Sequence, residues 1–251
     1  PELAIFGRKS DSRNVTLRHF IPTGKILKNA LKVSAPMTLE HGVICGAQIM
    51  VTVIVAPLGV FAIAANSFAV TAEALCYMPG YGIADAATTL VGQSFGAKRK
   101  DLARQFGYIT VGLGMFVMTL MGAVMWLFAP EVMRMFTPVE GIVDLGVEAL
   151  RIEAWAEPMF AASIVAYGVM VGVGDTLIPA SMNFLSIWLV RLPIAAVLAP
   201  VMGLRGVWIA MCVELCIRGF IFLWRLISGA WIKHGIDTAS ELAPSQVEPN
   251  I

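Results

Sequence analysis

The sequence predicts an all-α, polytopic membrane protein with six transmembrane helices, and three observations lead to this prediction. Hydrophobic residues make up 58% of the 251 residues and charged residues only 14%, whereas about 25% of a typical soluble domain is charged. The apolar residues gather in six long runs, each near or above the roughly 20 residues that cross a bilayer as a helix. The runs lack the polar–apolar alternation of a barrel, and a helix pairs its backbone amides internally, as lipid requires.

The six runs follow one another along the chain with short breaks between them. In order, they cover residues 28–55, 61–91, 104–128, 146–171, 177–199 and 206–229. The breaks carry the glycine and proline that are typical of turns. They are Pro57-Leu58-Gly59, Gly96 to Asp101, Ala129-Pro130, Gly172 to Thr176, and Pro200 to Gly203. Prolines also lie inside the runs, where each frees a backbone carbonyl and permits a kink. These are Pro36, Pro79, Pro158 and Pro193.

Composition divides the chain into three parts. Residues 1–25 are interpreted as a basic cytoplasmic linker, residues 26–232 as a six-helix transmembrane bundle, and residues 233–251 as a polar C-terminal tail. Thirteen of the 18 lysines and arginines flank one side of the predicted bundle and three flank the other. Because positive charge is enriched in cytoplasmic loops, we expect a multi-pass protein of the plasma (inner) membrane with both termini in the cytoplasm.

The composition also excludes several classes of function. A net charge of +1 provides no basic surface for a nucleic acid. The spans contain no HExxH motif, no Ser/His pairing and no CxxCH motif, so we expect a protein that is not an enzyme. Cys212 and Cys216 are one helical turn apart, but no histidine or acid cluster accompanies them. We therefore expect neither a metal site nor a cofactor.

Several ionisable residues nevertheless lie inside the apolar runs, where one charge costs about 2.5–3.5 kcal/mol to insert. The candidates among them are Glu40, Glu73, Asp85, Glu157, Arg191, Glu214 and Arg218. Glu214 and Arg218 are four residues apart on one helix, which predicts an internal ion pair. Arg191 and Glu157 lie about 12 and 17 Å from the same end of the bundle, at the helical rise per residue. They could therefore pair with each other, although Arg191 could also snorkel to the interface.

Glu40 and Glu73 lie on two helices that form an antiparallel pair with its turn near Leu58. Glu40 precedes Leu58 by 18 residues and Glu73 follows it by 15, which places the carboxyls at a similar depth, about 27 and 22 Å from the turn. No basic residue lies within a helical turn of either acid. Two interpretations stay open. In the first, each group is protonated or is bonded to a carbonyl freed by Pro36 or Pro79. In the second, the two groups form a proton or cation site.

Asp85 lies nearer the cytoplasmic end, among the small residues from Gly82 to Thr89. Small side chains permit either close helix packing or a water-filled lining, and both interpretations stay open. The GxxxG spacing of Gly168 and Gly172 is most simply a packing contact. The candidate cation- and substrate-binding residues are Glu40, Glu73, Asp85 and Glu157.

Four motifs, in this order, resemble those of the multidrug and toxic compound extrusion (MATE) transporters. They are Pro79-Gly80-x-Gly82 leading into Val91 to Ala97 (VGQSFGA), Gly168 to Thr176 (GxxxGxGDT), Trp188 to Pro193 (WxVRxP), and Gly203 to Ala210. The resemblance covers roughly residues 25–232 and is to the second of the two six-helix bundles of that family. It implies that the first bundle is missing from this chain. A partial sequence, which the absent initial methionine also suggests, is expected rather than a half that pairs with a second copy.

The resemblance implies a secondary antiporter without a cofactor that exports small organic, often cationic, drugs or toxins in exchange for Na⁺ or H⁺. Glu40 matches a seventh-helix acid implicated in cation coupling, and Glu73 falls where some members carry an eighth-helix acid. Phe160 stands where sodium-coupled members have a tenth-helix aspartate, and the nearest acid, Glu157, is one turn away. Two alternatives remain. One is a lipid-linked saccharide flippase of the same superfamily, which would need several intramembrane basic residues, and the other is a non-transporting membrane subunit.

Overall fold

The computed structural model describes residues 24–232, and every element in that range is helical. Residues 1–23 of the predicted linker and the whole predicted tail, 233–251, lie outside the described residues. The helices in order are α2 (Gly24–Val55), the 3₁₀ turn η2 (Ala56–Leu58), α3 (Val60–Gly96), α4 (Lys100–Phe136), α5 (Glu140–Glu153), α6 (Glu157–Gly172), α7 (Leu177–Ser186), the π-helical turn η3 (Ile187–Arg191), α8 (Leu192–Met202) and α9 (Leu204–Ser228). The all-helical fold is as the composition predicts.

Within the described residues, five helical segments are long and apolar enough to cross a membrane. They are Thr38–Leu58, Val60–Gly96, Lys100–Phe136, Leu177–Met202 and Leu204–Ser228. The pair of α5 and α6 makes a sixth span if it is counted as one bent crossing. The six predicted runs therefore correspond to these six segments, and α3 passes through Pro79 as one helix.

The fourth predicted run, 146–171, is not one straight helix, because α5 and α6 meet at an angle of 61°. Pro158 lies at the start of α6. It has no amide N–H to continue the ladder, and its ring would clash with the carbonyl of Ala154 in a continuous helix. Ala154, Trp155 and Ala156 form the turn instead, and the Ala156 amide donates to the Glu153 carbonyl at 2.7 Å. The bend follows from Pro158, which lies four residues after Ala154, the first residue beyond the end of α5.

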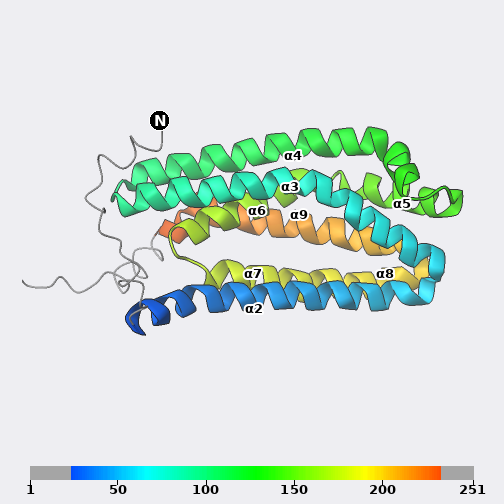
Figure 1. The fold of residues 1–251 in the computed structure, drawn as a ribbon, viewed down its shortest axis with the longest axis horizontal. Coiled ribbons are helices and arrows are strands. Elements are labelled where there is room, and N and C mark those ends of the chain that lie inside the picture. Colours follow the sequence, from blue (N-terminus) through cyan, green and yellow to red (C-terminus); the bar gives the residue numbers. More distant parts are fainter. Residues whose placement is uncertain (1–23, 233–251) are drawn as a thin grey trace, which may run out of the picture. The chain divides into compact units, whose positions relative to one another are not determined.

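Helices α3, α4, α6 and α9 form the packed centre of the fold. Helix α3 contacts α4 and α6, while α9 contacts α6 and α8. Figure 1 shows the C-terminal part of α3 side by side with α4, with α9 beneath them in that view. One hydrophobic core lies around α5 and includes Leu150 and Trp208, and a second lies around α6 and includes Val169 and Phe222.

Small residues let α3 and α6 approach closely. A methyl group on Gly168 would lie 2.6 Å from the Ala84 carbonyl oxygen, and one on Gly172 would lie 2.7 Å from that of Thr88. The Thr88 hydroxyl donates to the Gly168 carbonyl at 2.8 Å, across the same contact. The GxxxG spacing is therefore a packing contact, as the sequence suggests.

Replacing Gly168 by alanine should separate α3 from α6, because the added methyl group would overlap backbone rather than a flexible side chain. We expect the free energy of unfolding to fall by about 1–3 kcal/mol. The matched control is Gly112→Ala on α4, where nothing lies within 4 Å of the new methyl group. Unfolding of both variants in mixed detergent micelles measures the difference, and equal stabilities would contradict this account of the packing.

Candidate functional site

Two adjoining cavities lie among the helices. Their volumes are about 360 and 340 Å³, and both are lined by His41, Ile44, Tyr81, Phe160 and Arg218. The first cavity is also lined by Glu73, and the second by Glu40 and Asp85. Three of the four candidate residues therefore reach one continuous region of the fold, from helices α2 and α3.

Glu40 is the candidate acid with the most complete set of partners. Its side chain is 9% exposed. The Tyr167 hydroxyl of α6 donates to one carboxylate oxygen, and the Asn183 amide of α7 donates to the other at 2.5 Å. Each oxygen of this carboxyl group therefore accepts a hydrogen bond from a different helix. The partners of Glu40 thus come from neighbouring helices and not from the carbonyl freed by Pro36, which was one sequence-based interpretation.

Glu73 differs from Glu40 in its surroundings. It is 7% exposed and lines a cavity, and none of the hydrogen bonds or ion pairs between side chains of the described residues involves its carboxyl group. Arg191 and Arg218 are its cationic neighbours. A buried carboxyl that lines a cavity without a direct partner is available to a cation or a proton. The structure thus leaves Glu73 open to a ligand, while Glu40 is held by protein donors.

Asp85 combines the two interpretations that the sequence leaves open. Its neighbours Ala84 and Thr88 supply the close contact with α6. Asp85 itself is exposed and lines the cavity that contains Glu40. The segment from Gly82 to Thr89 therefore packs on one face and lines a cavity on another.

Glu157 lies outside both cavities, at the bend between α5 and α6, and is 1% exposed. Beside it is Glu153, which is 2% exposed and which the sequence analysis did not select. Both oxygens of Glu153 and Oε2 of Glu157 have no hydrogen-bond partner in the described part of the chain. Both acids are within electrostatic reach of Glu73. The bend therefore buries two carboxyl groups that line neither cavity.

Arg191 pairs with Glu214, so the possible pairing with Glu157 is wrong. Its Nε and Nη2 atoms donate to Oε2 of Glu214 at 3.0 and 2.7 Å. Arg218 forms an ion pair with Oε1 of the same group at 3.2 Å, which confirms the predicted pair within one helix. Ser186 donates a further hydrogen bond to Glu214 at 2.6 Å. The error arose because distance along the helices gives depth but not which helices are neighbours.

The MatE family model matches residues 36–197, which are well over half of the chain. The chain belongs to the MatE family. "Probable multidrug resistance protein NorM" of Thermotoga maritima is 31% identical over 215 residues, covering 84% of this chain and 46% of that protein. The protein of the same name from Pseudomonas aeruginosa is 27% identical over 194 residues, covering 74% of this chain and 40% of that protein.

Solved structures of MATE transporters have the same fold. A crystal structure of MATE in complex with MaL6 aligns with a TM-score of 0.79 at 22% identity, covering 87% of this chain and 50% of that one. The Vibrio cholerae MATE transporter VcmN in the bent form aligns with a TM-score of 0.79 at 16% identity, covering 95% and 53%. The chain thus spans about half the length of the relatives it matches, and it is a partial MATE protein with membrane-spanning helices.

Two of the MATE motifs have clear structural roles in this chain. Gly174 adopts φ +85°, and the amides of Gly174 and Asp175 donate to the carbonyls of Val171 and Met170, which together end α6. Asp175 then pairs with Arg225 of α9 at 2.5 Å. In the second motif, the π-helical turn η3 carries Arg191 toward Glu214 just before Pro193. These motif residues therefore hold the helices around the cavities.

Proposed function

We propose that this chain is half of a MATE antiporter that exports small organic cations in exchange for Na⁺ or H⁺. The observation that carries the proposal is the pair of adjoining cavities, which bring the carboxyl groups of Glu40, Glu73 and Asp85 to one region among apolar helices. Acids inside membrane spans mark ion and substrate pathways. The family and the names of the relatives support drug efflux as the function.

Aromatic side chains in the same region favour an organic cation as the substrate. Tyr77 packs edge-on against Tyr81, at 5.7 Å between ring centroids, and against Phe160, at 5.8 Å. All three line the cavity that contains Glu73. Aromatic faces attract cations most strongly where water is excluded. Carboxyl groups beside aromatic rings therefore suit a flat, positively charged organic molecule.

Competition for the acids would couple the two flows. Na⁺ or H⁺ that occupies Glu40 or Glu73 removes the negative charge on which the organic cation depends, and the organic cation in turn excludes the coupling ion. Because linkage is reciprocal, each ligand weakens the binding of the other by the same factor. We assign Glu153 and Glu157 to the same electrostatic system, since both lie within reach of Glu73.

The rest of the transport path would come from outside this chain. We propose that a first six-helix bundle, or a second copy of this one, closes the cavities in the inner membrane. The basic turn at Lys98, Arg99 and Lys100 between α3 and α4 would then lie in the cytoplasm, with both ends of the chain on the same side. Residues 1–25 would link the bundles, and residues 233–251 would form a cytoplasmic tail.

The saccharide flippase alternative finds less support. A site for a lipid-linked pyrophosphate needs cations that are free to bind phosphate. Arg191 and Arg218, the arginines that line the cavities, are both ion-paired with Glu214. The acids that line the cavities would in addition repel a pyrophosphate.

Transport by everted membrane vesicles from cells that express the protein tests this proposal. Vesicles with high Na⁺ or H⁺ inside should accumulate ethidium, an organic cation, because the luminal face corresponds to the cell exterior. An ionophore that dissipates the ion gradient should abolish the accumulation, and carboxyfluorescein, an organic anion, should not accumulate. Ethidium uptake that does not depend on the Na⁺ gradient or on the H⁺ gradient would contradict antiport of cations. Equal uptake of carboxyfluorescein would contradict it as well.

A further inference from the structure

A polar cavity and an apolar cavity meet at two tryptophans on the outer surface of the bundle. The polar cavity, about 500 Å³, is lined by Asp144, Glu148, Arg151 and Arg205. The apolar cavity, about 520 Å³, runs over Thr119, Gly122, Ala123, Leu127 and Pro158. Trp126 and Trp155 line both. This surface is separate from the two cavities that hold Glu40 and Glu73.

The position of the tryptophans places this junction at the edge of the bilayer. Trp126 lies two residues before the end of the third apolar run, and Trp155 is 76% exposed at the bend between α5 and α6. Tryptophan is enriched where headgroups meet acyl chains. Thr119, at the far end of the apolar cavity, is seven residues before Trp126 on α4, or about 10 Å deeper along the helix. The apolar cavity therefore descends from the headgroup level toward the acyl chains.

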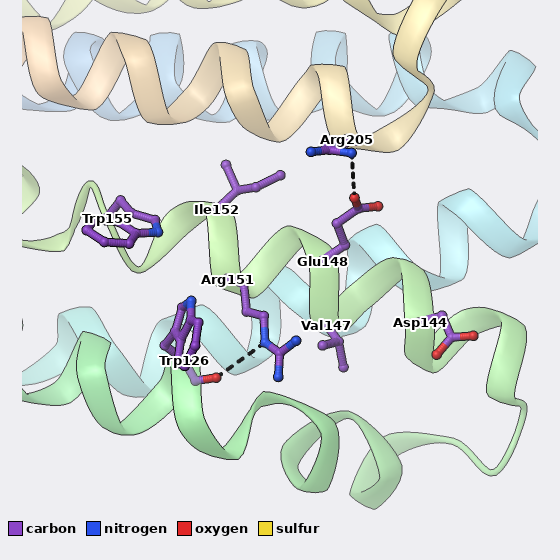
Figure 2. Close-up of a pocket in the computed structure, with 8 residues that line it drawn as sticks. All are labelled: Trp126, Asp144, Val147, Glu148, Arg151, Ile152, Trp155 and Arg205. Carbon is purple, nitrogen blue, oxygen red and sulfur yellow. Dashed lines mark hydrogen bonds and ion pairs between the residues drawn. The ribbon is translucent and has the colours of Figure 1, made fainter.

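The polar cavity carries two cations and two acids. Arg205 pairs with Glu148 at 3.1 Å. Arg151 lies 5.2 Å from the ring centroid of Trp126, and its Nε donates to the Trp126 carbonyl at 3.5 Å. Figure 2 shows Arg151 and Trp126 facing each other on one side of α5, with Asp144 further along the same helix. The formal charges of the cavity therefore sum to zero. Its positive end is at Arg151 and its negative end is at Asp144.

Two charged groups of this cavity are left to bind a ligand. The terminal nitrogens of Arg151 have no partner among residues 24–232, and neither has the Asp144 carboxylate. A guanidinium group binds phosphate through two parallel hydrogen bonds. A carboxylate accepts hydrogen bonds from an ammonium group. A zwitterionic headgroup with one phosphate and one amine therefore matches both Arg151 and Asp144. A headgroup with negative charge alone would be repelled by Asp144.

We propose that this surface binds one phospholipid with a phosphoethanolamine headgroup. Arg151 holds the phosphate, Asp144 holds the ammonium group, and one acyl chain lies in the apolar cavity between Trp126 and Trp155. The floor of that cavity is close to the bend, because a methyl group on Gly122 would lie 3.0 Å from Cγ of Glu157. The bound lipid therefore covers the α5–α6 bend from the membrane side.

Native mass spectrometry of the purified protein tests this proposal. Delipidated protein is titrated with dioleoyl lipids that carry an ethanolamine, choline or glycerol headgroup. We expect one ethanolamine lipid to be retained with an affinity about tenfold above that of the other two, since charge-assisted hydrogen bonds to both ends separate them. Soluble glycerophosphoethanolamine, which has the headgroup without acyl chains, should not displace the lipid at equal concentration.

Two variants remove the two parts of the site. Arg151→Gln removes the phosphate ligand, and Ala123→Phe fills the apolar cavity from an exposed position. Each should lower retention of the ethanolamine lipid about tenfold. The matched controls are Arg134→Gln, an exposed arginine outside the cavity, and Val124→Phe, the next residue on α4, which lines neither cavity. Both controls should retain the lipid. Thermal unfolding in detergent confirms that each variant is folded.

The proposal is overturned by any of three results. Equal retention of all three lipids would show that the headgroup is not recognised. Unchanged retention by folded Arg151→Gln or Ala123→Phe would show that the lipid lies elsewhere. Displacement by glycerophosphoethanolamine at equal concentration would identify a site for a soluble zwitterion rather than for a bilayer lipid.

Discussion

Replacing Glu214 by alanine should cause the largest loss of stability in this protein. Glu214 is 0% exposed and is the shared partner of Arg191 and Arg218, which are themselves almost buried. Removal of the carboxylate leaves two guanidinium groups near each other without a counter-charge. Breaking a buried ion pair by removing one partner costs about 3–5 kcal/mol, so we expect poor expression and a fall in unfolding free energy of that size.

The matched control is Glu140→Ala, which breaks an ion pair with Arg134 whose side chains are 65% and 56% exposed. An exposed pair contributes about 0–1 kcal/mol, so this variant should unfold like the wild type. Unfolding in mixed detergent micelles, with expression measured alongside, compares the two. If Glu214→Ala were as stable as Glu140→Ala, the charge cluster would not hold η3 and α9 together.

Replacing Glu40 by glutamine should abolish drug resistance without loss of the folded protein. Glutamine has the same shape and can still accept a hydrogen bond from Tyr167 or Asn183, but it carries no charge and exchanges no proton. Under the proposed antiport, the variant can neither attract the organic cation nor release it on ion binding. We expect resistance at the level of cells that lack the transporter, measured as the minimal inhibitory concentration of ethidium.

Glu131→Gln is the matched control for Glu40→Gln. Glu131 is an exposed acid of α4 that lines neither cavity, so its replacement should leave resistance unchanged. Membrane fractions probed for the protein show whether both variants are present in equal amounts. Wild-type resistance in the Glu40→Gln strain would remove Glu40 from the mechanism.

The number and type of elements could be predicted from the sequence because both depend on local composition. The six apolar runs are long enough to span a bilayer, and their breaks carry glycine and proline. The Glu214–Arg218 pair was also predictable, since its four-residue spacing is fixed by the helix itself. Membership of the MATE family rested on four ordered motifs, which the family model confirms.

Contacts between helices could not be predicted in the same way. The partners of Glu40 are 127 and 143 residues away in the sequence, and only the fold brings them together. Arg191 was assigned the wrong partner because depth alone does not identify the neighbouring helix. Glu153 was missed because it lies near the polar residue Arg151 and resembles the outer end of a span. The bend at Pro158 then buries it.

Competition between an organic cation and the coupling ion, measured on the purified protein, tests the central claim most directly. Ethidium binding is followed by fluorescence while Na⁺ is raised at constant pH, and in a second series while pH is lowered without Na⁺. We predict that one of these ions weakens ethidium binding to the wild type. In Glu40→Gln, ethidium should bind about tenfold more weakly than in the wild type. The coupling ion should no longer change the affinity of this variant for ethidium. Equal ethidium affinity and equal ion sensitivity in the two proteins would contradict the assignment of these cavities to cation exchange.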